Sequence, residues 1–165
     1  MEDTKKQTVE AQINTYVQSA SKADLEILSH IVENLQQKKD SKESYLSALV
    51  NMKQTMRSGN ELEMTIPIHP IIHNSLNMVH GGITATLADS AMGSLVHQLL
   101  PDGQTAVTTN LSVQYIRPGI GESLTCIASV THQGKQLCVT EARVYNHVNK
   151  LIATAHATFA VILKK

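Results

Sequence analysis

The 165-residue sequence lacks the features that direct a protein to a membrane or to nucleic acid. None of its apolar runs approaches the ~18 residues of a membrane span. Lys plus Arg and Asp plus Glu are equal at 14 each, so no net field attracts nucleic acid. The first residues, MEDTKKQTVEAQ, also lack the apolar stretch of a signal peptide. We therefore expect a cytoplasmic protein with no membrane partner and no nucleic-acid partner.

Cysteine is scarce, since only Cys126 and Cys138 are present. A hairpin that turns near residues 133–134 would place Cys126 opposite about Glu141, and the two thiols would then not face each other. We expect two reduced cysteines that behave as small buried hydrophobic residues.

Two common hydrolytic designs are also missing or disfavoured. The sequence has no Gly-x-Ser-x-Gly motif, which argues against a Ser-His-Asp esterase. His69, His73 and His80 could bind zinc, but their spacing would need a helix that Pro70 and the strand pattern before it oppose. We expect no metal site.

From residue 1 to about residue 60 the apolar residues recur at helical spacing. Ser21 and Asp24 have the spacing of a capping box and predict a helix that follows them. A further helix is expected after Asp40 and Ser41, and it would end at residues 57–60. Its apolar face would carry Tyr45, Leu46, Leu49, Met52 and Met56.

After residue 60 the hydrophobic pattern changes to a period of two, which is typical of strands. The long apolar segment 82–100 is the single long helix candidate in this part. Strands are expected at about 62–68, 105–116, 122–132, 136–146 and 150–163. These elements predict an α+β fold in which a twisted antiparallel sheet wraps around one long central helix.

The stretch MVHGGITATLADSAMGSL (78–95) places one carboxylate, Asp89, within an otherwise small and apolar helix. No Lys or Arg lies within one turn, so the partner of this charge must be a substrate, a water or another segment. Such a carboxylate suits a general base or a nucleophile. An Asp on a helix face that simply reaches solvent is the alternative.

His80-Gly81-Gly82 opens the same helix. The backbone N–H groups of Gly81 and Gly82 have no helical acceptor and lie at the positive end of the helix dipole. They could therefore stabilise negative charge on a carbonyl oxygen, as an oxyanion hole does. Upstream, the amide of Asn74 could hold a water molecule.

These motifs, followed by TTNLSVQYIRPG (108–119), resemble the PaaI-like group of hotdog-fold acyl-CoA thioesterases. The resemblance extends over about residues 44–163. It implies a hotdog thioesterase domain at 41–165, with residues 1–40 as a helical extension. It also implies a homodimer or homotetramer with active sites at the dimer interface, an acyl-CoA substrate, and no cofactor apart from the coenzyme A of that substrate.

The resemblance further implies a role for each motif residue. Asp89 corresponds to the carboxylate that activates water or attacks the thioester, and Asn74 to the residue that positions the water or the thioester. The N–H of Gly81 corresponds to the donor to the thioester oxygen. His80 would orient the loop or the thioester, and Thr108 would place a hydroxyl beside the carboxylate.

Outside these motifs, Arg117 and Lys135 are candidate contacts for coenzyme A phosphates, although surface turns commonly carry such charges. Tyr115 and Phe159 are rare aromatic residues that belong either to the core or to a pocket wall.

Two other functions remain open. A hotdog enoyl-CoA hydratase or dehydratase would need a catalytic His paired with an acid. A non-catalytic acyl-CoA sensor with an N-terminal DNA-binding segment would need a basic face, whereas residues 1–60 hold equal numbers of acidic and basic residues.

Overall fold

The computed structural model describes residues 2–39 and 43–164. The chain divides into two compact units, Met1–Leu49 and Val50–Lys165. Among the helices of the described ranges, none combines the length and the hydropathy that a membrane crossing requires.

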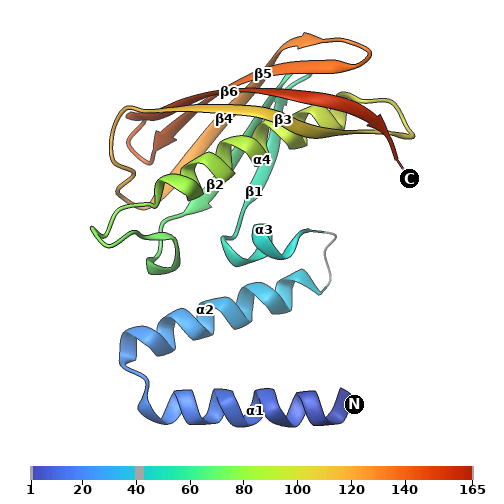
Figure 1. Ribbon diagram of the computed structural model, residues 1–165. Coiled ribbons are helices and arrows are strands. Elements are labelled where there is room, and N and C mark those ends of the chain that lie inside the picture. The colour runs from blue at the N-terminus through green and yellow to red at the C-terminus, as the bar shows by residue number, and fades with distance from the viewer. Residues whose placement is uncertain (1, 40–42, 165) are drawn as a thin grey trace. The chain divides into compact units, whose positions relative to one another are not determined.

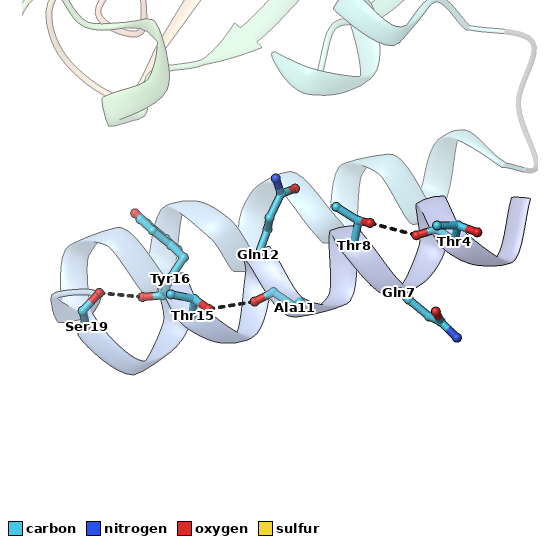
Figure 2. A pocket seen from close by; sticks show the side chains of 8 residues that line it. All are labelled: Thr4, Gln7, Thr8, Ala11, Gln12, Thr15, Tyr16 and Ser19. Atoms are coloured by element: carbon cyan, nitrogen blue, oxygen red, sulfur yellow. Dashed lines mark hydrogen bonds between the residues drawn. The ribbon is translucent and has the colours of Figure 1, made fainter. Parts of the chain in front are cut away.

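The first unit contains the helices α1 (Glu2–Ser19), α2 (Lys22–Lys38) and α3 (Tyr45–Leu49). Residues 3–19 of α1 are exposed along the whole helix. The hydroxyls of Thr8, Thr15 and Ser19 donate to helix carbonyls three or four residues earlier (Figure 2). Because these polar groups are satisfied within the helix, they do not depend on tertiary contacts.

The capping box predicted for α2 is confirmed. The Ser21 hydroxyl accepts from the Asp24 N–H, and the Asp24 carboxylate accepts from the Ser21 N–H at 3.1 Å. The Ser21 hydroxyl also donates to the Asp24 carboxylate at 2.7 Å. This bond, followed by the one from the Ser21 N–H, favours the charged carboxylate and lowers the pKa of Asp24. The cap expected at Asp40 and Ser41 lies outside the described residues.

The prediction that a helix runs to residues 57–60 is wrong. Helix α3 ends at Leu49, and Asn51 has a φ of 50°, the left-handed conformation in which Asn often ends a helix. Residues Lys53–Ser58 form strand β1 instead, at one edge of the sheet, where they pair with the next strand. The helical spacing of methionines in this segment therefore does not decide its structure, because ladder hydrogen bonds to a neighbouring strand are available.

The second unit is a six-stranded antiparallel sheet with one long helix, α4 (Gly81–Leu99), against one face (Figure 1). The strand order is β1-β2-β4-β5-β6-β3, so β1 and β3 are the edges. Apart from β1, the strands are β2 (Glu61–Pro67), β3 (Gln104–Tyr115), β4 (Ser123–Gln133), β5 (Leu137–Asn146) and β6 (Leu151–Leu163). The α+β hotdog arrangement predicted from the sequence is confirmed.

The core lies between α4 and the sheet. Leu87 and Leu95 of α4 are fully buried, and alternate residues of the strands face them. Small side chains let the layers approach closely: the Cα of Gly93 lies against the ring of Phe159, which a Cβ would meet at 3.4 Å. Phe159 is thus a core residue.

Both cysteines are free and buried, as expected. The register differs from the prediction, because Cys126 lies opposite Val144 rather than Glu141. The β4–β5 connection begins after Gln133 and a bulge interrupts β4, so the turn centre falls later than the sequence suggested.

Candidate active site

The N-terminus of α4 is built around the His80 side chain. His80 is the N-cap, and its Nδ1 accepts a hydrogen bond from the Gly82 N–H at 2.9 Å. An acceptor Nδ1 requires the proton of the neutral ring to be on Nε2. The Gly82 N–H was expected to be available to a ligand, but this bond occupies it.

Gly81 keeps a free donor. Its N–H has no acceptor within residues 2–39 and 43–164, and it lies at the positive end of a 19-residue helix. Its carbonyl accepts a hydrogen bond from the Tyr115 hydroxyl at 2.8 Å. Of the two glycines, Gly81 is therefore the one that can bind an oxyanion.

Asn74 holds the loop that leads into α4. It follows a short 3₁₀ turn, Pro70–Ile72, and its Oδ1 accepts from the backbone N–H groups of Leu76 and Met78 at 2.9 and 3.3 Å. Because the side-chain oxygen is engaged, the amide NH₂ is the part of Asn74 left to donate to a ligand. Asn74 and Gly81 line one cavity of about 340 Å³.

Asp89 lies further along α4 and is partly buried. The Thr108 hydroxyl of strand β3 donates to its Oδ1 at 2.9 Å. A bulge follows Thr108 in the β3–β6 ladder. In the described part of the chain no ion pair involves Asp89. The carboxylate is thus oriented by one neutral donor and keeps its second oxygen for another partner.

Within one chain these groups form two separate half-sites. We call Asn74 with Gly81 the donor half-site, and Asp89 with Thr108 the carboxylate half-site. Asp89 lies eight positions after Gly81 in α4, which corresponds to about 12 Å along the helix axis. A single thioester carbonyl cannot bridge that distance, so one chain alone does not bring the candidate residues together.

The two candidate phosphate contacts also lie apart. Arg117 lines the same cavity as the donor half-site, and its Nη1 donates to the Leu151 carbonyl at 2.8 Å. Lys135 is in the turn after β4, whereas Arg117 lies before that strand. The 11 residues of β4 span roughly 35 Å, so the two cations of one chain cannot bind the same phosphate.

Two other candidate sites are the hollow along α1 and a metal site. The hollow along α1 is lined mainly by uncharged polar residues, together with Ala11 and Tyr16, and Figure 2 shows hydroxyls there bonded to helix carbonyls. No group of three or more His, Cys, Asp or Glu side chains suited to a metal ion occurs in the residues that are described. In contrast, Tyr115 lines the cavity of the donor half-site, which agrees with the pocket-wall alternative for this residue.

Comparisons with known proteins show which family this chain resembles. Residues 76–153 match the Thioesterase superfamily. Acyl-coenzyme A thioesterase PaaI of Escherichia coli is 32% identical over 91 residues, which cover 54% of this chain and 63% of the relative. Acyl-coenzyme A thioesterase 13 of the mouse is 33% identical over 87 residues, which cover 52% of this chain and 61% of the relative. The chain thus spans less than two thirds of the length of these two relatives.

A solved structure extends the similarity. A Bacillus halodurans protein, crystallised with CoA, is 41% identical, with a TM-score of 0.84. The match covers 89% of this chain and 98% of that protein. Together with the helix-and-sheet architecture and the matched motif region, these similarities show that the chain belongs to the thioesterase superfamily of hotdog proteins.

Proposed function

We propose that this protein hydrolyses an acyl-CoA thioester to a free acid and coenzyme A. The observation that carries the proposal is the Thr108–Asp89 hydrogen bond of 2.9 Å, because it orients a carboxylate that has no ion-pair partner among the described residues. The names of the two curated relatives, and the CoA bound to the Bacillus halodurans protein, support the substrate class.

In the proposed reaction the thioester oxygen accepts from the Gly81 N–H, and the amide of Asn74 helps to hold the thioester or the attacking water. Asp89 removes a proton from that water as it attacks the carbonyl carbon. The C–S bond then breaks, and the coenzyme A thiolate leaves and takes up a proton. Direct attack by Asp89, with an anhydride that water then hydrolyses, uses the same residues.

We propose that two copies of the chain complete each active site. The donor half-site of one copy would face the carboxylate half-site of the other, because the two lie about 12 Å apart along α4 in a single copy. Strand β3 is a 12-residue edge, largely exposed, and pairing with a second β3 would satisfy its free N–H and C=O groups. The arrangement predicts a dimer or a tetramer built from such dimers.

For coenzyme A binding we propose Arg117 as a phosphate contact, because its guanidinium lines the cavity beside the donor half-site. Lys135 could serve only if a second copy brought its turn toward that cavity. The Gly82 N–H supports the site indirectly, through its bond to His80.

The test is release of free thiol from a panel of acyl-CoA thioesters, aromatic through long-chain, by wild type, Asp89→Asn and Asp102→Asn. Asp102 lies in an exposed turn and provides a matched loss of one charge. We expect turnover by wild type and by Asp102→Asn, and a loss of at least about 100-fold in Asp89→Asn. Hydration of enoyl-CoA without hydrolysis would favour a hydratase. Tight acyl-CoA binding without any turnover would favour a sensor.

A further inference from the structure

Tyr115, the last residue of β3, connects the sheet edge to the first turn of α4. Its hydroxyl donates to the Gly81 carbonyl at 2.8 Å. Three atoms of its phenol group lie 3.5 Å from the position that a Cβ of Gly81 would occupy. The side chain is 56% exposed, so burial in the core does not explain its placement.

The Gly81–Gly82 peptide is held at both of its polar ends. Its carbonyl, which belongs to Gly81, accepts from Tyr115, and its N–H, which belongs to Gly82, donates to Nδ1 of His80. The preceding peptide is held as well, because the His80 carbonyl accepts from the N–H groups of Ile83 and Thr84 at 2.9 and 3.2 Å. We call this set of contacts the glycine clamp.

The clamp matters because glycine has the greatest backbone freedom of all residues. An oxyanion donor is effective only if its direction is fixed before the charge develops. With the peptides on both sides of its Cα held, Gly81 has a fixed direction for its one free N–H. The Gly81 carbonyl is also placed to accept a hydrogen bond within the helix, so it does not need the Tyr115 hydroxyl as a donor.

We propose that Tyr115 is a positioning residue that fixes the Gly81 N–H toward the thioester oxygen, an inference that rests on the proposed thioesterase function. Tyr115 acts through the glycine clamp and transfers no proton. It therefore affects the transition state, in which the oxyanion is strongest, more than it affects substrate binding.

The experiment compares Tyr115→Phe with Tyr145→Phe on the best thioester of the panel. Tyr145, on β5, is half-buried, and its hydroxyl has no hydrogen bond within the described residues, so it is a matched loss of a phenol OH. We expect kcat to fall about 3- to 10-fold in Tyr115→Phe, with KM within twofold, since one hydrogen bond is lost and the ring stays. Tyr145→Phe should retain both parameters.

A second readout follows the donor itself. The chain has eight glycines, so labelling with ¹⁵N-glycine gives a small amide spectrum in which Gly81 and Gly82 can be assigned. We expect Tyr115→Phe to shift or broaden these two signals and to leave that of Gly59 unchanged. An unchanged kcat or unchanged Gly81 signal in an active enzyme would overturn the inference alone. Absence of turnover by wild type on every thioester would overturn the proposed function and this inference with it.

Discussion

Replacing Thr108 by Val tests whether the carboxylate half-site is catalytic. Val has the shape of Thr but no hydroxyl, so the change removes the 2.9 Å bond to Oδ1 of Asp89 and little else. A hydrogen bond to a charged group contributes about 1.5–3 kcal/mol. Because Thr108 is exposed, we take the lower end, about 1.5 kcal/mol, which corresponds to roughly a tenfold loss in rate.

The assay is thiol release from the best acyl-CoA, measured for wild type, Thr108→Val, Asp89→Asn and the double variant. We expect kcat to fall about tenfold in Thr108→Val. In the Asp89→Asn background the same change should have little further effect, since the hydroxyl acts only through that carboxylate.

The neighbouring Thr109→Val is the control. The Thr109 hydroxyl bonds to the Thr158 carbonyl at 3.0 Å and not to Asp89, so kcat should stay near the wild-type value. Two results would refute the reasoning. One is an undiminished rate in Thr108→Val, and the other is an equal loss in both backgrounds, which would mean that Thr108 acts independently of the carboxylate.

Three further predictions follow from other parts of the structure. Arg117→Ala should raise KM for acyl-CoA several-fold and leave kcat within about twofold, whereas an unchanged KM in steady-state kinetics would remove Arg117 from the phosphate site. Burial raises the pKa of Cys126 to about 12, so a thiol reagent at pH 8 should not modify it in the folded protein. Because the thiol of the unfolded chain ionises at a lower pH, the free energy of unfolding should fall as pH rises from about 9 toward 12. Gly121→Ala should lower the free energy of unfolding by about 1–3 kcal/mol in urea titrations, because the φ of 115° suits only glycine and a Cβ would meet a neighbouring imidazole ring. Gly59→Ala, where a Cβ meets nothing, should leave the free energy of unfolding unchanged.

Periodicity was sufficient to predict the second unit of the fold from about residue 61 onward. The strand from about residue 122 and the helix from about residue 82 lie within one residue of β4 and α4, because each pattern is long and ends at a Gly or Pro turn. Periodicity failed at residues 52–58. There Met52 and Met56 have helical spacing, and the signal that ends the helix is a single residue, Asn51.

The candidate site shows a similar limit. Sequence spacing identified Asp89 and the glycine pair as candidates, since an isolated charge and a helix start are local features. Which glycine N–H is free depends on the orientation of the His80 ring. The contact between Tyr115 and Gly81 joins residues that are 34 positions apart in the sequence. Such contacts depend on the tertiary fold, so no pattern within one segment predicts them.

Because both cysteines are buried, the folded protein should give little background signal in an assay that detects free thiols. Reagents that report the release of coenzyme A react with any accessible thiol, and here the folded protein contributes none from its described residues. The natural chain can therefore be used where other proteins need a cysteine-free variant. A single cysteine introduced at Leu76, which is 70% exposed in the loop beside the donor half-site, would take up a fluorophore alone and follow substrate arrival in real time.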